Sequence, residues 1–265
     1  MKVAIIGAGN MGGAIARGLV QSGVVRPADM ILTVQSEASR ERLRGQNAEW
    51  KLSTDNRTAV EQADVVILAV KPWLMEEVIA GLRDGLSLDR QIVISVAAGP
   101  TLDDLHRWLS ANGVASPALF RAIPNTAVEV LSGVTFLSER GANEVQRDVV
   151  ERLFSSLGYA TYVDENRIEA GMALASCGIA FAMRYIRASA EGGVELGLYP
   201  KDAQRIAALT VKGAAELLLR SGNHAEEEID KVTTPGGITI RGLNEMEHAG
   251  FTSAVVRGLK ACVKK

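Results

Sequence analysis

A glycine-rich turn near the start of the chain limits most strongly what the chain can fold into. Its six residues match the pattern GxGxxG: Gly7, Ala8, Gly9, Asn10, Met11 and Gly12. The turn follows a β-branched run, Lys2–Ile6, and opens a segment with helical spacing, Asn10–Gln21. There the first glycine permits a tight turn, the second lets backbone N–H groups approach a pyrophosphate, and the third lets helix pack on strand. The motif predicts a dinucleotide site; the alternative is a strand-to-helix turn with chance glycines.

Strand-like and helix-like segments alternate after this turn. Two continuous apolar runs, Asp64–Val70 and Gln91–Val96, suit strands buried on both faces, as in a parallel sheet covered by helices. Further strands are expected at Met30–Val34, Leu119–Ile123, Gly133–Leu137 and Tyr159–Val163, and helices at Glu37–Gly45, Trp73–Leu86 and Thr101–Leu109. The alternation predicts an α/β domain of the Rossmann type, with a doubly wound sheet, over residues 1–163.

The remainder of the chain, residues 164–265, is rich in alanine and reads as an all-helical domain. Helices are expected at Glu165–Glu191, Lys201–Arg220, Gly237–Ala249 and Thr252–Val263. The sequence Thr-Thr-Pro-Gly-Gly at Thr233–Gly237 predicts a break between two of them. Long helices with few aromatic side chains suit close helix–helix contact, either in a dimer or in a monomeric bundle.

Composition excludes several classes of protein. The 265 residues carry 29 basic and 31 acidic side chains, so no general attraction to nucleic acid or to a membrane surface is expected. No apolar stretch approaches the roughly 18 residues of a membrane span, and the N-terminal segment lacks a secretory pattern. The two cysteines and three histidines lack the spacing of a zinc site or a disulfide scaffold. We expect a cytoplasmic protein that binds no metal.

The residues after the second expected strand bear on the choice of dinucleotide. An NAD site usually places Asp or Glu there, to bind the ribose 2′-hydroxyl. This chain has Val34, Gln35 and Ser36, with Arg40 and Arg42 close behind. Neutral donors beside arginine favour a 2′-phosphate, so NADP(H) is the expected cofactor and NAD(H) the alternative. The two arginines also fit an ordinary solvated helix face.

Two later strand ends are expected to complete the cofactor site, because ligands of open α/β sheets bind at the carboxyl ends of the strands. Both ends carry small residues or a turn: Ala69, Val70, Lys71 and Pro72 at one, and Val96, Ala97 and Ala98 at the other. Small side chains there would let a nicotinamide ribose lie against the backbone. We assign Lys71 to the cofactor, although a surface lysine before a proline is equally consistent.

Several stretches together resemble the pyrroline-5-carboxylate reductases, over nearly the whole chain. They are IGAGNMGGAIARGL, DVVILAVKP, SVAAG, RAIPNTA and, most specifically, VTTPGGITIRGLNEM at Val232–Met246. The resemblance implies an enzyme that reduces 1-pyrroline-5-carboxylate to L-proline with NAD(P)H, the final step of proline biosynthesis. It also implies a homodimer made by the helical domain, often assembled into larger rings. The substrate would lie between the nicotinamide and the Pro-Gly-Gly loop, which the partner subunit can supply.

The resemblance carries over to individual positions. Thr239 matches the threonine whose hydroxyl meets the ring nitrogen, and Thr234, Gly236 and Gly237 match the loop that holds the carboxylate. Asn56 matches a cofactor contact and Glu165 an acidic residue near the substrate. Hydride transfer to a cyclic imine needs no strong acid, which agrees with the absence of a His–Asp or Lys–Tyr pair. On loop composition alone, Thr239 also fits a plain helix start.

One segment departs from the family pattern. Where the family usually reads Ser-Gly-Ser-Gly-Pro-Ala-Tyr, this chain has Ala175–Phe181, ASCGIAF. Ser176 and Cys177 are then the candidate substrate contacts, although Cys177 also fits a small buried hydrophobe. The departure leaves open a reductase of another cyclic imino acid, such as the six-membered homologue. It also leaves open a dinucleotide-binding protein without turnover.

Overall fold

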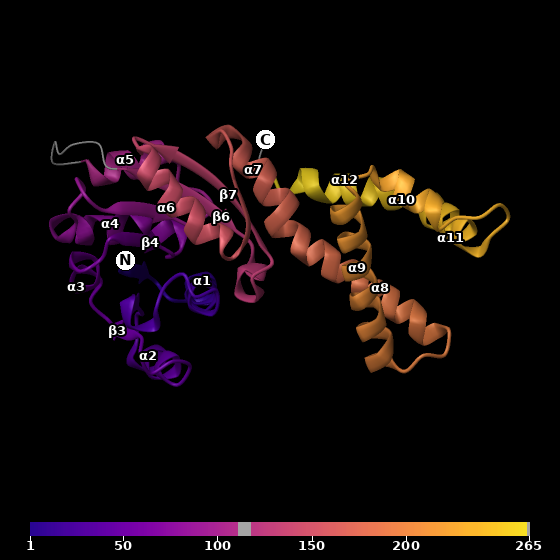
Figure 1. The fold of residues 1–265 in the computed structure, drawn as a ribbon, viewed down its shortest axis with the longest axis horizontal. Helices are drawn as coiled ribbons and strands as arrows, with labels where there is room; N and C mark the ends of the chain where they lie inside the picture. The colour runs from indigo at the N-terminus through magenta and orange to yellow at the C-terminus, as the bar shows by residue number, and fades with distance from the viewer. Residues whose placement is uncertain (111–117, 264–265) are drawn as a thin grey trace. The chain divides into compact units, whose positions relative to one another are not determined.

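The computed structural model describes residues 1–110 and 118–263. The chain forms two compact units, Met1–Ser176 and Cys177–Lys265, which Figure 1 colours from indigo to salmon and from salmon to yellow. The first is an α/β unit and the second is helical. No helix within the described residues has the length and apolar character needed to cross a membrane.

The first unit is built on an eight-stranded sheet with the order β3-β2-β1-β4-β5-β6-β7-β8. Neighbouring strands pair in parallel except β6 and β7, which pair antiparallel. The strands are β1 Val3–Ile6, β2 Met30–Thr33, β3 Lys51–Ser53, β4 Val65–Leu68, β5 Ile92–Ser95, β6 Leu119–Pro124, β7 Gly133–Arg140 and β8 Gly158–Tyr162. The predicted doubly wound α/β sheet is confirmed.

The strands belong in the centre because both of their faces are apolar. All four residues of β1 are fully buried, and alternate residues enter different clusters: Val3 and Ile5 pack on one face, Ala4 and Ile6 on the other. Two-sided burial is what continuous apolar runs such as Asp64–Val70 predict for a parallel sheet. The carboxyl ends of β1, β2, β3, β4 and β5 consequently meet at one edge, where the candidate cofactor residues follow.

The helices of the first unit cover both faces of this sheet (Figure 1). They are α1 Asn10–Gln21, α2 Glu37–Arg44, α3 Asn56–Glu61, α4 Met75–Leu82, α5 Leu102–Leu109 and α6 Glu144–Ser155, with short 3-10 turns between some of them. The helix expected at Trp73–Leu86 is present as α4 but is shorter than predicted, because 3-10 turns at Pro72–Leu74 and Arg83–Gly85 flank it. The sequence reading also missed β3, α3 and α6.

The expected single helix over Glu165–Glu191 is broken in the structure. It consists of a 3-10 turn Glu165–Arg167, a short helix α7 Ile168–Gly171, a π-helical segment Met172–Cys177 and the long helix α8 Gly178–Glu195. Apolar periodicity alone does not distinguish a π-helical insertion from a regular helix, because both keep the backbone coiled in the same direction. The end of the π-helical segment overlaps the start of Ala175–Phe181, the stretch that departs from the family pattern.

The helical unit continues with α9 Pro200–Ser221, α10 Ala225–Lys231, α11 Ile238–His248 and α12 Phe251–Ala261. α8 and α9 pack against each other so closely that a Cβ on Gly193 would lie 3.2 Å from the Cβ of Ala203. The predicted helix over Lys201–Arg220 and the break at Thr233–Gly237 are confirmed; α10 was missed.

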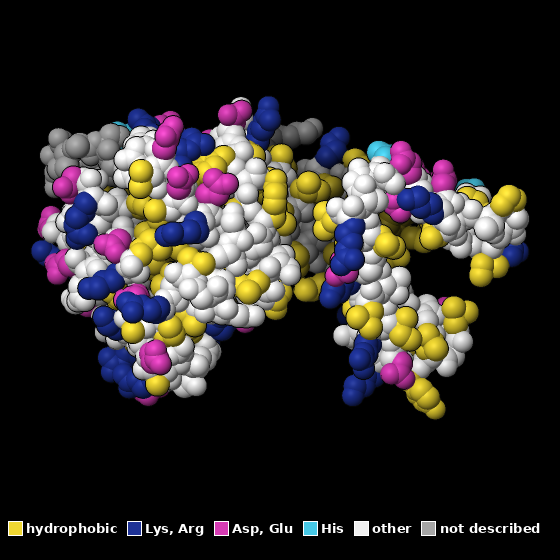
Figure 2. Space-filling model, in the orientation of Figure 1, with side chains coloured by type: hydrophobic (Ala, Val, Ile, Leu, Met, Phe, Trp, Pro, Cys, Tyr) yellow, Lys and Arg dark blue, Asp and Glu magenta, His cyan; other side chains and the backbone are white. Residues whose placement is uncertain are grey.

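Few side chains of the helical unit are buried within a single chain. None is fully buried in α8, α10, α11 or α12, and α9 buries only Ala203 and Ala207. Large apolar side chains therefore lie open, as the yellow atoms on these helices show (Figure 2); examples are Leu196, Tyr199, Leu219 and Ile238. Exposed apolar area of this extent marks an interaction surface.

Candidate functional site

The glycine turn between β1 and α1 has the geometry of a phosphate cradle. Gly7 has φ +92°, and a Cβ there would lie 2.9 Å from Val70 Cγ1 and 3.1 Å from the Ala69 carbonyl oxygen. A Cβ on Gly12 would lie 2.5 Å from the Gly7 carbonyl oxygen. A Cβ on Gly9, by contrast, would meet nothing within 4 Å. The first and third glycines are thus required by packing, whereas Gly9 borders open space.

The start of α1 offers backbone donors to that open space. Gly9 is the N-cap residue and makes no side-chain capping hydrogen bond. The first N–H groups of a helix lack intrahelical partners and lie at the positive end of the helix dipole. Thr33 fixes the turn beside them, since its hydroxyl accepts from Gly7 N–H at 3.1 Å and its carbonyl from Ala8 N–H at 2.8 Å. This arrangement fits an anion such as a pyrophosphate.

The end of β2 leads directly into α2. Val34 is buried and donates its N–H to the Ser53 carbonyl at 3.1 Å, whereas Gln35 and Ser36 are exposed. The Ser36 hydroxyl caps α2 by accepting from Ser39 N–H at 3.3 Å. Arg40, one turn into α2, pairs with Glu37 at 2.9 Å. Exposed neutral side chains therefore follow β2, where a site for NAD would usually carry Asp or Glu.

The remaining cofactor candidates lie at the same edge of the sheet. Ala69 through Pro72 follow β4, and Ala69 N–H donates to the Ile6 carbonyl at 2.9 Å, beside the glycine turn. Val96, Ala97 and Ala98 follow β5; the first two are buried and Ala98 is exposed. Asn56 opens α3, just after β3. Lys71 is exposed, with its ammonium 6.0 Å from the Trp73 ring centroid. The sheet topology thus brings the candidates together from five parts of the sequence, after β1, β2, β3, β4 and β5.

Glu165 is held by a buried arginine. One oxygen of its carboxylate, Oε1, accepts from Arg121 Nη1 at 2.7 Å and from the backbone N–H of Leu102 at 2.7 Å. The Arg121 side chain is 7% exposed and that of Glu165 31%. Sequence reasoning missed Arg121 as a functional residue, although the RAIPNTA stretch contains it. The pair links β6, the start of α5 and the segment after β8.

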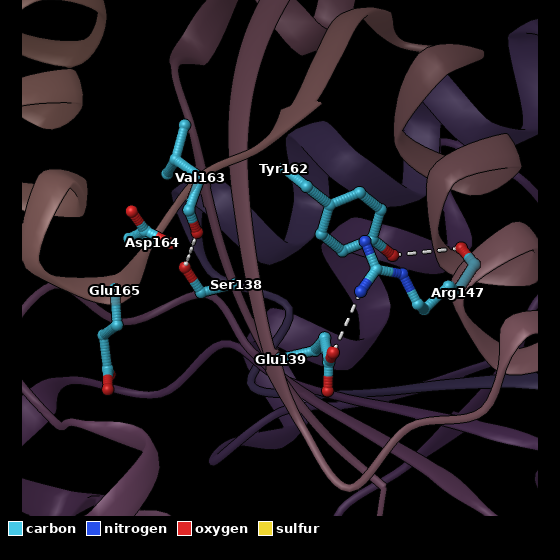
Figure 3. Close-up of a pocket in the computed structure, with 7 residues that line it drawn as sticks. All are labelled: Ser138, Glu139, Arg147, Tyr162, Val163, Asp164 and Glu165. Carbon is cyan, nitrogen blue, oxygen red and sulfur yellow. Dashed lines mark hydrogen bonds and ion pairs between the residues drawn. The ribbon is translucent and has the colours of Figure 1, made fainter.

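Glu165 also lines a cavity of about 360 Å³ at the end of β7 and β8. Figure 3 shows the lining side chains: Ser138, Glu139, Arg147, Tyr162, Val163, Asp164 and Glu165. Arg147 pairs with Glu139 at 3.0 Å and lies 4.4 Å from the Tyr162 ring centroid, and the Tyr162 hydroxyl donates to the Arg147 carbonyl at 3.0 Å. Burial raises the pKa of Tyr162 to about 12. These polar groups satisfy one another, so the cavity wall presents few free donors.

Ser176 is fixed within the first unit. Its hydroxyl donates to the Pro124 carbonyl at 3.3 Å, and the buried Asn125 side chain donates to the Ala175 carbonyl at 3.2 Å. Asn125 Oδ1 also accepts from the N–H groups of Ala127 and Val134, at 3.2 and 3.3 Å. The end of β6 thus anchors the π-helical segment. Cys177, the next residue, is half-buried, and burial raises the pKa of its thiol.

In the helical unit, the Thr234–Gly237 segment forms a tight turn. The Gly237 N–H donates to the Thr234 carbonyl at 2.8 Å, with Pro235 and Gly236 between them and φ +70° at Gly236. Proline followed by a glycine with positive φ is the requirement of a type II turn. Gly237 is the N-cap of α11 without a side-chain cap, and the exposed Thr239 is the second residue of that helix. The turn presents backbone N–H groups and hydroxyls together, as carboxylate binding requires.

The described residues contain no group of His, Cys, Asp or Glu side chains that could hold a metal ion. The donors at the glycine turn and at the Thr234–Gly237 turn are backbone N–H groups and hydroxyls. Both sets suit anionic groups.

Two family models match the chain. Residues 165–265 match a model described as pyrroline-5-carboxylate reductase dimerisation, and residues 2–99 match one described as NADP oxidoreductase coenzyme F420-dependent. Two curated relatives come from Dictyostelium discoideum. Its pyrroline-5-carboxylate reductase 2 is 34% identical over 100% of this chain and 91% of its own length. Its pyrroline-5-carboxylate reductase 1 is 38% identical over 97% of this chain, which spans only 48% of that relative.

Solved structures agree with these matches. A pyrroline-5-carboxylate reductase from Coxiella burnetii has a TM-score of 0.87 at 30% identity, covering 98% of this chain and 95% of its own. The pyrroline carboxylate reductase of Plasmodium falciparum, solved with NADP bound, shares the fold with a TM-score of 0.87 at 22% identity, covering 99% and 95%. With its glycine turn, its Thr234–Gly237 turn and whole-length similarity to these proteins, the chain belongs to the pyrroline-5-carboxylate reductase family.

Proposed function

We propose that this protein reduces 1-pyrroline-5-carboxylate to L-proline with a hydride from NADPH. The observation that carries the proposal is similarity to reductases of that name over the full length of the chain, from the glycine turn to the Thr234–Gly237 turn. The reaction has two needs: a site for the dinucleotide, and donors for the carboxylate and ring nitrogen of the imine. Local geometry supports each of them.

The residues at the sheet edge fit a dinucleotide. Gly9 leaves the space in front of the uncapped α1 start open, so the pyrophosphate would accept from the first N–H groups of that helix. Asn56, Ala69–Pro72 and Val96–Ala98 would hold the rest of the molecule against backbone. When bound, the reduced nicotinamide supplies the hydride. The protein's own part is to fix the orientation of the ring and to exclude water.

NADP(H) is the preferred cofactor in this proposal. No carboxylate lies among Val34, Gln35 and Ser36, so nothing there repels a 2′-phosphate. Arg40 and Arg42 lie within the following helix and add positive charge, although Arg40 forms an ion pair with Glu37. A structural neighbour was solved with NADP. NAD(H) would also fit but would lack a dedicated carboxylate partner for its 2′-hydroxyl.

The Thr234–Gly237 turn and the start of α11 would bind the imine. The Thr234 hydroxyl and the Gly236 N–H would hold its carboxylate, while the Gly237 N–H closes the turn by donating to the Thr234 carbonyl. The Thr239 hydroxyl would hydrogen-bond the ring nitrogen. The nitrogen of a cyclic imine is basic enough to be partly protonated, and the iminium carbon accepts hydride directly. The protein therefore needs only to orient the substrate, with Glu165, Ser176 and Cys177 as further candidate contacts.

A steady-state assay tests the reaction and the role of Thr239 together. Purified protein should oxidise NADPH only when 1-pyrroline-5-carboxylate is present, and should use NADH less efficiently. Thr239→Val, which removes the hydroxyl and keeps the shape, should lower kcat/KM for the imine roughly fivefold to thirtyfold, since one hydrogen bond is worth about 1–2 kcal/mol. The KM for NADPH should stay nearly unchanged.

The matched control is Thr239→Ser, which keeps the hydroxyl and should retain most of the activity. Lost NADPH binding in Thr239→Val would instead mean that the residue is misplaced in this scheme. Absence of imine-dependent turnover with both nicotinamides, in a folded sample, would overturn the proposed reaction. Faster turnover of the six-membered cyclic imino acid would assign the chain to that substrate instead.

We further propose that the protein is a homodimer formed by the helical domain, with the nucleotide domain at residues 1–163 and the helical domain at 164–265. β8 ends at Tyr162, and the match to the dimerisation model begins at residue 165. The helices leave Leu196, Tyr199 and Leu219 exposed in a single chain, and a second copy would cover such area. Sedimentation equilibrium should give at least twice the 28.2 kDa mass; a stable monomer at micromolar concentration would contradict the proposal.

A further inference from the structure

Helices α8 and α12 of the helical unit pack against each other at successive levels. The rings of Tyr185 and Phe251 meet edge to face, with centroids 6.3 Å apart. At the next level a Cβ on Gly258 would lie 3.7 Å from the Phe181 ring. The contacts move toward the start of α8 as they move toward the end of α12. The two helices therefore run antiparallel, with one face of each directed at the other.

One helical turn beyond the contact between Phe181 and Gly258, the two helices carry the two cysteines. Cys177 lies four residues before Phe181, and Cys262 lies four residues after Gly258, so each continues the contacting face of its helix. Cys177 is the residue before α8 and Cys262 the residue after α12. The Cys262 thiol donates to the Gly258 carbonyl at 3.4 Å, on the helix face that carries the Phe181 contact, and the pKa of the Cys177 thiol is raised first by burial and then by the neighbouring Cys262. The two thiols are thus neighbours across the helix pair.

We propose that Cys177 and Cys262 of one chain form a reversible disulfide that ties the start of α8 to the end of α12. They are the only cysteines in the sequence, both are free thiols, and both are half-buried rather than sealed in the core. Their wide separation in the sequence gives no hint of pairing, because the contact depends on the packing of two helices. An apolar role for Cys177 would not require a second thiol at the facing position.

Formation of this disulfide needs a two-electron oxidant, and a low-molecular-weight disulfide such as oxidised glutathione can serve as one. The Cys262 thiol releases its proton to water, and its sulfur attacks one sulfur of the oxidant, which expels the first thiolate. Cys177, whose raised pKa keeps it protonated longer, then loses its proton and attacks Cys262 Sγ, expelling the second thiolate. The two cysteines lose two electrons and two protons, and the oxidant is reduced to two thiols.

The disulfide would close a loop that contains α9, α10, the Thr234–Gly237 turn and α11. Closing a long loop restricts the unfolded chain and so stabilises the folded unit. The expected effect is a rise of roughly 5–10 °C in the Tm of the oxidised protein. The effect does not depend on turnover, so it holds whether or not the proposed reaction is correct.

The test uses the full-length protein equilibrated with mixtures of reduced and oxidised glutathione. Wild type should lose both titratable thiols and two hydrogen atoms of mass per chain, and digestion without reductant should join the peptides that carry Cys177 and Cys262. Reductant should restore the thiols and the original Tm. The matched controls, Cys177→Ser and Cys262→Ser, should each keep a glutathione adduct on the remaining cysteine, with no rise in Tm.

Three results would overturn the proposal. Disulfide-linked dimers of the wild type would show that the cysteines pair between copies. Persistent glutathione adducts on both wild-type cysteines would show that the thiols cannot reach one another. An equal rise in Tm for wild type and Cys262→Ser would show that oxidation acts without the crosslink.

Discussion

Replacing Gly9 with alanine should weaken NADPH binding about tenfold or more and leave the thermal stability of the protein unchanged. Gly9 has φ −76°, outside the left-handed region that favours glycine, and its added Cβ would meet no protein atom within 4 Å. The methyl group would instead occupy the space through which a pyrophosphate approaches the α1 backbone. A tenfold loss corresponds to about 1.4 kcal/mol of binding free energy. Fluorescence titration with NADPH and a thermal melt of the apoprotein measure the two effects.

Gly12→Ala is the matched control, because the same methyl group at that position would clash with protein atoms instead of entering open space. Its Cβ would lie 2.5 Å from the Gly7 carbonyl oxygen and 3.1 Å from both the Ala69 Cβ and Ile5 Cγ2. Overpacking of this kind costs about 1–3 kcal/mol, or roughly 2–10 °C in Tm. Equal losses of stability in the two variants would contradict the assignment of Gly9 to the ligand. So would NADPH binding of wild-type strength in Gly9→Ala.

Glu165→Ala should destabilise the first unit by about 3 kcal/mol or more, because it leaves the Arg121 guanidinium buried without its carboxylate. Glu165 Oε1 is 2.7 Å from Arg121 Nη1, and the arginine side chain is only 7% exposed. Arg121 Nε already lacks a hydrogen-bond partner among the described residues. The same substitution also frees the Leu102 N–H at the start of α5. Urea unfolding followed by circular dichroism gives the loss as a change in midpoint.

Arg121→Met should cost less than Glu165→Ala. Methionine fills much of the apolar volume of the arginine stem, and the Glu165 carboxylate, 31% exposed, keeps access to water and to the Leu102 N–H. The double variant Arg121→Met/Glu165→Ala should be more stable than Glu165→Ala alone, since no charge is left buried. An Arg121→Met variant at least as unstable as Glu165→Ala would contradict this account, because it would show that the buried, unpaired charge is not the main cost of losing Glu165.

The sheet was largely predictable because its strands are apolar on both faces. Strands at Val3–Ile6, Val65–Leu68 and Ile92–Ser95 match continuous β-branched runs, and the glycine turn marks the start of α1. The short strand β3 was missed, because its three residues are mostly polar and lie toward the sheet edge. α6 was missed as well, although Asn143 and Gln146 form a capping box at its start, a signal that could have located it.

Some features of the candidate site depend on local sequence, and others depend on contacts between segments that are far apart in the chain. The phosphate turn at Gly7–Gly12 and the turn at Thr234–Gly237 are determined by the sequence itself, because each depends on backbone conformations that neighbouring glycine and proline residues impose. Only the tertiary structure decided that Arg121 pairs with Glu165, that Asn125 holds the π-helical segment, and that α8 packs against α12. Those contacts join segments far apart in the chain, so they depend on strand order and helix packing, which local patterns leave undetermined.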